Sequence, residues 1–232
     1  MSGPFDERDP KMLGGSDAAT RILSVTEIET PFVENVYEKA SLWYDWWFGP
    51  TLHAGRLESI GRLGIQPGDQ VLEVGVGTGI NASLYPEHCR VMGIDLSMRM
   101  LRKAAKRLGR RGVTNVRLQQ MDAEDLSFPD DSFDVVYAPY TISVVSDPIK
   151  AVHEMRRVTK PGGRFVFLNH FLSTNRRVAW IERFISPVTV HVGFKADLDL
   201  PAFLVQAGLE PVSIAKVNIP RIFSLVICEK DG

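Results

Sequence analysis

Three carboxylates stand at or near the ends of short apolar runs, where parallel strands of a sheet hold their ligands. Asp95 follows the run RVMGI and can accept hydrogen bonds from both hydroxyls of a ribose. Asp122, in MDAEDL, can accept a hydrogen bond from the exocyclic amine of an adenine. Glu73 lies inside VLEVGVGTG, where its charge suits an ammonium group and repels a phosphate. Together they predict a ligand that carries adenosine and a positively charged tail.

Three glycines in the same stretch, Gly75, Gly77 and Gly79, allow a ligand to approach the backbone closely. A nicotinamide dinucleotide is the first candidate, but its fingerprint is G-x-G-x-x-G, whereas here Ile80 follows G-x-G-x-G. That difference disfavours a pyrophosphate. An adenosine that ends in an ammonium-bearing amino acid is S-adenosylmethionine, which becomes the predicted cofactor. The structural alternative is a tight strand-to-helix turn, with Asp95 as part of a helix cap.

Strand-like runs alternate with helical patterns from residue 67 onward, which is the order of right-handed βαβ units. The expected strands cover residues 70–74, 90–94, 115–120, 133–138, 163–168, 210–217 and 222–229. The expected helices lie near residues 79–86, 97–108, 147–159 and 200–207. The predicted fold is α/β: a Rossmann-like, doubly wound sheet of seven mostly parallel strands, with an antiparallel last strand and an N-terminal helical lid.

The chain divides into an arm, a lid and a main domain. Residues 1–30 are polar and contain paired glycines, which indicates a flexible arm. Residues 31–66 carry apolar and aromatic side chains at helical spacing, and we expect them to form a lid that can touch a membrane. Residues 67–232 form the main domain. An insertion at 171–199 interrupts it and is expected to shape the acceptor pocket.

The overall composition disfavours several classes of partner and site. Lysine and arginine number 27 against 28 aspartate and glutamate, so the net charge of −1 gives no reason to expect a nucleic-acid partner. Cys89 and Cys228 stand far apart and fit buried reduced thiols. No metal is expected, because His153-Glu154 does not continue as HExxH and no other histidines are paired. Without a signal-like or long apolar run, the sequence predicts a cytoplasmic protein.

Residues 67–170 and the last two strands resemble the class I S-adenosylmethionine-dependent methyltransferases. The resemblance rests on the ordered motifs VLEVGVGTG, GIDLS, MDAEDL, FDVVYAPY and VTKPGGRFVF. Five motifs in order are far more specific than one glycine loop. The resemblance implies that the cofactor is held by Tyr44, Glu73, Gly75, Gly77, Gly79, Asp95, Leu96, Ser97, Met98, Asp122, Ala123 and Ala138.

The acceptor is predicted from Ala138-Pro139-Tyr140, which resembles the NPPY or DPPY motif of amino-group methyltransferases with Ala in place of Asn or Asp. The missing side chain holds a planar amine in adenine and glutamine enzymes, so a nucleobase or amide acceptor is disfavoured. The Tyr140 ring can instead contact a compact amine through a cation–π interaction, or it can simply pack in its loop. Tyr37, Tyr140 and His170 are the candidates to take the proton of the amine, and a structural role for His170 stays open.

The aromatic residues of the lid indicate where a bilayer can be met. At 3.6 residues per turn, Trp43 and Trp46 point away from the side that carries Tyr37, Tyr44 and Trp47. One helix can therefore cover the cofactor and also rest in a membrane interface, where tryptophan is favoured. The three tryptophans are the lid's membrane candidates. A lid packed wholly onto the domain is the alternative.

Two segments with basic side chains are further candidates for lipid contact. The 171–199 insertion mixes basic and apolar groups and contributes Arg176, Arg177, Trp180 and Arg183. The run RMLRKAAKRLGRR at 99–111 holds seven basic residues and no acid. That run fits a solvated helix face as well as an anionic surface, so we expect the insertion to be the stronger candidate.

The chain as a whole resembles the bacterial phospholipid N-methyltransferases that act on phosphatidylethanolamine. The resemblance rests on NVYEKASLWYDWWFGP, YAPYTISVVSDP, FLNHF and PRIFSLVICE, and it extends into the lid. It implies stepwise methylation of this phospholipid to phosphatidylcholine by an enzyme bound peripherally to the cytoplasmic face of the membrane. The alternatives are a small-molecule methyltransferase of the quinone or sterol type, and a cofactor-binding membrane module without chemistry.

Overall fold

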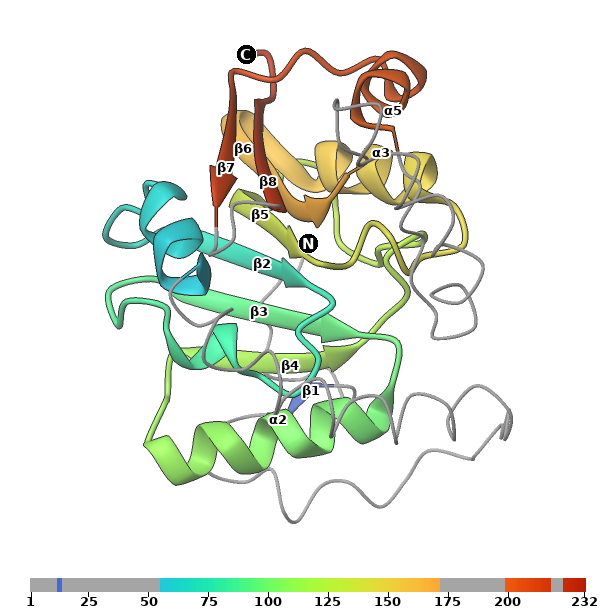
Figure 1. Ribbon diagram of the computed structural model, residues 1–232. Helices are drawn as coiled ribbons and strands as arrows, with labels where there is room; N and C mark the ends of the chain where they lie inside the picture. Colours follow the sequence, from blue (N-terminus) through green and yellow to red (C-terminus); the bar gives the residue numbers. More distant parts are fainter. Residues whose placement is uncertain (1–11, 14–54, 172–198, 218–222) are drawn as a thin grey trace.

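The computed structural model describes residues 12–13, 55–171, 199–217 and 223–232 (Figure 1). One sheet lies at its centre, with the strand order β1-β4-β3-β2-β5-β6-β8-β7. The strands are β1 Met12–Leu13, β2 Gln70–Val74, β3 Arg90–Asp95, β4 Val116–Gln120, β5 Phe133–Pro139, β6 Thr159–His170, β7 Ser213–Val217 and β8 Phe223–Glu229.

Strands β4, β3, β2, β5 and β6 are parallel to one another. The last strand, β8, is antiparallel to both of its neighbours, β6 and β7. The predicted sheet of seven mostly parallel strands with an antiparallel last strand is therefore confirmed. The two-residue β1 pairs antiparallel with β4 and adds an eighth strand, which the sequence did not predict.

Helices cover both faces of the sheet. They are α2 Met98–Arg111, α3 Pro148–Val158, α5 Leu200–Ala207, the 3-10 helix η1 Asn81–Ser83 and a helical segment at 55–62. Alternate strand residues point to opposite faces, so the core forms two clusters. Leu72 packs in the cluster with α3 and α5, whereas its neighbour Val71 packs in the cluster with α2 and segment 55–62. The sheet is thus doubly wound, as the alternation of strands and helices predicted.

Polar caps explain where the long helices begin. The Ser97 hydroxyl accepts a hydrogen bond from the Met100 N–H at 3.3 Å and caps α2. The Asp147 carboxylate accepts from the Ile149 and Lys150 N–H groups and caps α3. Each cap satisfies backbone donors that have no partner inside the helix. The predicted helices near 97–108, 147–159 and 200–207 are confirmed by α2, α3 and α5.

One local prediction is wrong. The helix expected near 79–86 is reduced to the three residues of η1. Gly79 has a left-handed backbone at φ 74° and Pro86 blocks continuation, so only residues 80–85 remain, which are too few to nucleate an α-helix. The expected strand at 163–168 lies within the longer β6, which has an irregularity where the pairing shifts from Phe133 opposite Thr159 to Val135 opposite Arg164.

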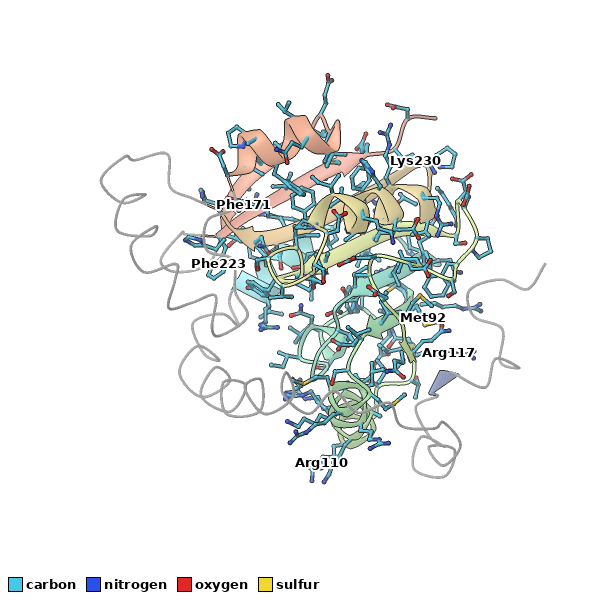
Figure 2. All side chains as sticks on the ribbon, turned by 90° about the vertical axis from the view of Figure 1, so that its right-hand side faces the viewer. Met92, Arg110, Arg117, Phe171, Phe223 and Lys230 are labelled. Atoms are coloured by element: carbon cyan, nitrogen blue, oxygen red, sulfur yellow. The ribbon has the colours of Figure 1, made fainter. Side chains whose placement is uncertain are left out.

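The strand order reverses next to β2. The chain passes from β2 through β3 to β4 on one side, and β5 then lies on the other side of β2. The carboxyl ends of β2 and β5 are tied together by the Thr141 hydroxyl, which donates to the Val74 carbonyl at 2.8 Å. Ligands of doubly wound sheets bind outside the strand ends at such a point. Figure 2 looks onto this edge of the sheet.

Candidate active site

The three glycines of the loop after β2 have two different roles: two allow close packing, and one leaves space for a ligand. All three have positive φ: 74° at Gly75, 54° at Gly77 and 74° at Gly79. A Cβ at Gly75 would overlap the Thr141 side chain, and one at Gly79 would lie 2.9 Å from the Ala104 Cβ. At Gly77 no described atom beyond its chain neighbours lies within 4 Å of that position. Gly75 and Gly79 therefore pack the loop onto the fold, and Gly77 leaves room for a ligand.

Four backbone N–H groups of the loop donate to acceptors inside the protein. Gly75 and Val76 both donate to the Ile94 carbonyl, at 2.9 and 2.8 Å. Gly77 donates to Asp95 Oδ2 at 2.8 Å, and Gly79 donates to the Val76 carbonyl at 3.0 Å. A loop that cradles phosphates offers such groups to its ligand instead. This hydrogen bonding agrees with the sequence pattern in disfavouring a pyrophosphate.

Asp95, at the end of β3, is held in place by two backbone donors. Its Oδ1 accepts from the Ser97 N–H at 2.9 Å, and its Oδ2 accepts from the Gly77 N–H. Burial raises the pKa of Asp95, and the two hydrogen bonds oppose that rise. Each carboxylate oxygen keeps a further lone pair, so both can still accept a hydroxyl. The geometry fits the predicted ribose contact, which stays a prediction.

The residues predicted to surround the adenine follow β3 and β4. The Leu96 side chain is 66% exposed, which is unusual for a leucine beside a strand end. The Met121 N–H donates to the Asp95 carbonyl at 3.2 Å, so the segment after β4 lies against the end of β3. That segment holds the exposed Asp122 and the buried Ala123. Leu96 can thus offer an apolar surface and Asp122 a carboxylate to one flat ring.

Three further predicted cofactor residues have structural positions. Ser97 caps α2, and Met98 is the first residue of that helix and packs partly against the core. The Ala138 side chain is fully buried in the core cluster that contains α3. Ala138 therefore presents no exposed side chain to a ligand.

Glu73 is a buried carboxylate at the carboxyl end of β2. Its side chain is 1% exposed, and its Oε2 has no hydrogen-bond partner among the described residues. Burial raises the pKa of Glu73 to about 8, although Tyr85, Arg56 and Asn81 act to lower it. A buried acceptor without a partner is costly unless a ligand supplies the donor. Glu73 is therefore suited to the ammonium group that the sequence predicted for it.

Arg56, Asn81 and Tyr85 surround Glu73 and were missed by the sequence reasoning. The Arg56 Nη1 donates to Asn81 Oδ1 at 2.8 Å, which joins segment 55–62 to η1. Ser59, on the same segment, hydrogen-bonds to the Tyr137 hydroxyl at 2.8 Å. These residues meet only after helix and sheet have packed, and no motif or spacing marks them.

Tyr140, just after β5, has a constrained backbone at the acceptor side of the site. Its φ is 60°, which is rare for a residue with a large side chain, and its N–H donates to the Leu168 carbonyl at 2.6 Å. The Arg56 guanidinium carbon lies 5.3 Å from the centre of the ring. Arg56 therefore covers part of that face of the Tyr140 ring, and an acceptor amine can contact only the part that Arg56 does not cover.

His170, the last residue of β6, lies near Tyr140 through a shared aromatic neighbour. The Phe223 ring centre is 5.2 Å from that of Tyr140 and 6.0 Å from that of His170. Phe223 begins β8, and the antiparallel pairing sets it opposite His170. Figure 2 labels Phe223 close to Phe171, the residue that follows His170. Two of the three predicted proton acceptors thus meet at Phe223, which the sequence reasoning did not single out.

Several predicted residues lie outside the described part of the chain. These are Tyr37, Trp43, Tyr44, Trp46 and Trp47 of the lid, and Arg176, Arg177, Trp180 and Arg183 of the insertion. None of the helices in the described ranges has the length and apolar character needed to cross a bilayer. Within the same ranges, no three His, Cys, Asp or Glu side chains are grouped as metal ligands would be.

The described residues fit S-adenosylmethionine. Glu73 offers an orphaned buried acceptor for the ammonium group, and Gly77 offers open space beside the loop. Asp95 offers two anchored oxygens to the ribose, while Leu96 and Asp122 offer an apolar surface and an acceptor to the adenine. The cofactor supplies a methyl group on a sulfonium, and these residues would bind and orient the molecule that carries it.

Comparisons with known proteins agree with this site. A family profile described as a methyltransferase domain matches residues 72–167. The phosphatidylethanolamine N-methyltransferase of Cereibacter sphaeroides is 33% identical over 200 residues, which cover 86% of this chain and 98% of that protein. The ubiquinone/menaquinone biosynthesis C-methyltransferase of Bdellovibrio bacteriovorus is 36% identical over 119 residues, which cover 50% of each protein.

A solved structure shares the fold. Phosphoethanolamine N-methyltransferase 2 of Haemonchus contortus, in complex with phosphomonomethylethanolamine and S-adenosylhomocysteine, has a TM-score of 0.65 at 19% identity. The similarity covers 82% of this chain and 57% of that chain. Three observations agree on the family and the cofactor. They are the profile match, the relative matched over nearly its full length, and the fit of the site residues to S-adenosylmethionine. The chain belongs to the class I S-adenosylmethionine-dependent methyltransferases.

Proposed function

We propose that the chain transfers methyl groups from S-adenosylmethionine to the amine of phosphatidylethanolamine and of its mono- and dimethyl forms, giving phosphatidylcholine. The observation that carries this proposal is the extent of the match to the C. sphaeroides enzyme, which covers 86% of the chain. A shared cofactor alone would account for a match confined to the methyltransferase domain at 72–167. The match reaches beyond that domain, and this supports a shared acceptor.

The acceptor side of the site has the chemistry that a lipid amine needs. An amine must lose its proton before it can attack a methyl group, and it must be aligned with water kept away. Phe223 and Pro139 are buried apolar groups beside Tyr140 that can exclude water. His170 contacts the same Phe223 ring, and its imidazole is the described candidate to take the proton.

A phospholipid acceptor requires the enzyme to work at a membrane surface. We therefore infer that the chain is cytoplasmic and binds peripherally to the inner face of the membrane. The tryptophans Trp43, Trp46 and Trp47 and the 171–199 insertion are the proposed contacts, for the reasons given by their composition.

The second candidate is methylation of a quinone-type small molecule. It is favoured by the 36% identity to the C-methyltransferase of B. bacteriovorus, although that match spans about half of each protein. The two functions differ in the atom that accepts the methyl group, which is nitrogen in the lipid and carbon in the quinone. They therefore predict different lipid products in the same cell.

Expression of the chain in a bacterium that makes phosphatidylethanolamine but no phosphatidylcholine tests the proposal. Mass spectrometry of the total lipids should reveal the mono-, di- and trimethylated phospholipids. The matched control is Asp95→Asn, which removes one carboxylate of the cofactor site and should strongly lower the amount of these products at equal expression. Unchanged phosphatidylethanolamine together with newly methylated quinones would establish the second candidate instead.

A further inference from the structure

Arg56 lies at the cofactor site without any role assigned to it so far. It is half-buried, donates to Asn81 Oδ1 at 2.8 Å and stacks over the Tyr140 ring. Its charge acts on Glu73, and it is the one cation among the described groups that contribute to the pKa of that residue. A guanidinium has five N–H donors, so its bond to Asn81 leaves other donors for a ligand.

The amino-acid end of S-adenosylmethionine carries a carboxylate as well as an ammonium group. Loops after the first strand commonly bind anions through backbone N–H groups. Here the N–H groups of Gly75, Val76, Gly77 and Gly79 are all donated to acceptors within the protein. The next helical element, η1, is only three residues long. A side-chain cation beside the loop is therefore a candidate partner for the carboxylate.

We propose that Arg56 binds the α-carboxylate of S-adenosylmethionine and of its demethylated product, while Glu73 binds the ammonium group. The two charges of the ligand sit on the same carbon atom, so their partners must be neighbours in the protein. Glu73, once the ligand has ionised it, and Arg56 are such a pair of opposite charge at the carboxyl end of β2, and Asn81 holds Arg56 on that side. A guanidinium binds a carboxylate in a bidentate way, which fixes the tail of the ligand.

A pair of ligands isolates the proposed contact. S-adenosylhomocysteine carries both charges, whereas its decarboxylated analogue keeps the amine and lacks the carboxylate. Calorimetric titration should show that the wild-type protein prefers S-adenosylhomocysteine by about 10- to 100-fold, the value of a charge-assisted hydrogen bond. Arg56→Met should bind both ligands about equally. Because each preference compares two ligands on one variant, a general loss of stability cancels.

Matched variants make the test decisive. Arg62→Met changes an exposed arginine of segment 55–62 that pairs with Glu58, and it should keep the wild-type preference. Arg56→Lys keeps the positive charge but cannot bind a carboxylate through two N–H groups, so it should keep part of the preference. If Arg56→Met binds neither ligand, Arg56→Lys takes its place in the comparison. A preference in Arg56→Met or Arg56→Lys equal to that of the wild type overturns the proposal. The test measures cofactor binding alone and stands apart from the identity of the acceptor.

Discussion

Glu73 is the residue at which burial and ligand chemistry are most closely linked. With a pKa raised to about 8, its side chain carries a proton in the unliganded protein at neutral pH. Binding an ammonium group favours the ionised form, so the proton must leave when the cofactor or its product binds. Titration of S-adenosylhomocysteine at pH 7 in two buffers of different ionisation enthalpy should therefore reveal release of close to one proton. Glu73→Gln should bind more weakly and release none.

The same carboxyl group makes stability depend on pH. The unfolded chain loses this proton near the ordinary value of 4.5, whereas the folded protein keeps it up to about pH 8. Between these values the unfolded state binds fewer protons, so the stability of the unliganded protein falls as pH rises, by at most about 1.4 kcal/mol per pH unit. Urea denaturation of wild type and Glu73→Gln across pH 4.5 to 8 checks this. Parallel pH profiles would mean that Glu73 is already ionised.

Asp95 accepts two hydrogen bonds from the backbone and is also predicted to bind the ligand. Asp95→Asn keeps an oxygen for one of the two N–H donors, so it should retain the native near-ultraviolet spectrum. It should weaken S-adenosylhomocysteine by about 1.5–3 kcal/mol, the range of hydrogen bonds to a charged group. Calorimetry measures the loss, and Asp69→Asn, at the opposite end of β2, is the matched control. Unchanged affinity in a folded Asp95→Asn protein would remove this residue from the site.

At the residue scale, the sequence predicts site residues at strand ends and misses site residues that tertiary packing brings to the site. Glu73 and Asp95 could be placed because a strand end is visible in the sequence and parallel strands end at one edge. Arg56 and Phe223 could not, since one comes from a helix before the sheet and the other from the antiparallel last strand. Their positions depend on tertiary contacts that no local pattern records.

At the scale of elements, the glycine loop separates stability from binding. Gly75→Ala collides with Thr141, so it should lower the free energy of unfolding by more than about 2 kcal/mol. Gly77→Ala meets no described side chain and should cost only the 1–2 kcal/mol or so of a left-handed alanine, but it should weaken S-adenosylhomocysteine. Thermal unfolding and calorimetry separate the two effects.

Gly112→Ala is the control for the backbone strain. Gly112 ends α2 with φ 66°, close to the φ of Gly77, and no described side chain lies near its Cβ position. It should lose a similar amount of stability and no affinity. Equal affinity losses in the Gly77 and Gly112 variants would mean that the ligand does not approach the loop at Gly77.

The lid prediction also belongs to this scale and concerns residues outside the described ranges. If one helix serves both cofactor and bilayer, changing Trp43 and Trp46 to Ser should reduce co-sedimentation with vesicles and leave cofactor affinity unchanged. Changing Tyr37 and Tyr44 to Phe should do the reverse, because positions seven residues apart share a side. Equal effects of both pairs on both properties would indicate a lid with a single face.

Elements were predictable to the extent that local signals decide them. The α5 helix was placed correctly at 200–207, with Asp199 as cap and Gly208 at its end. The helix expected near 79–86 failed because its apolar spacing was outweighed by the left-handed Gly79 and by Pro86. Breakers near both ends of a short segment override its periodicity.

At the scale of the whole molecule, the topology explains why the site lies where it does. The reversal of strand order beside β2 brings the glycine loop next to Tyr140, and the antiparallel β8 brings Phe223 to the same edge. Among the described residues, those predicted to bind cofactor and acceptor thus lie at one end of one sheet. The acceptor itself depends on chemistry beyond the fold, because one fold serves many acceptors.

The most direct measurement uses purified protein, phosphatidylethanolamine vesicles and S-adenosylmethionine with a deuterated methyl group. Fragmentation of the recovered lipids in a mass spectrometer locates the label. The account predicts deuterated methyl groups on the headgroup nitrogen, first one and then more with time, and a much lower rate with Asp95→Asn. Unlabelled phosphatidylethanolamine, recovered with protein that binds S-adenosylhomocysteine normally in calorimetry, would contradict it.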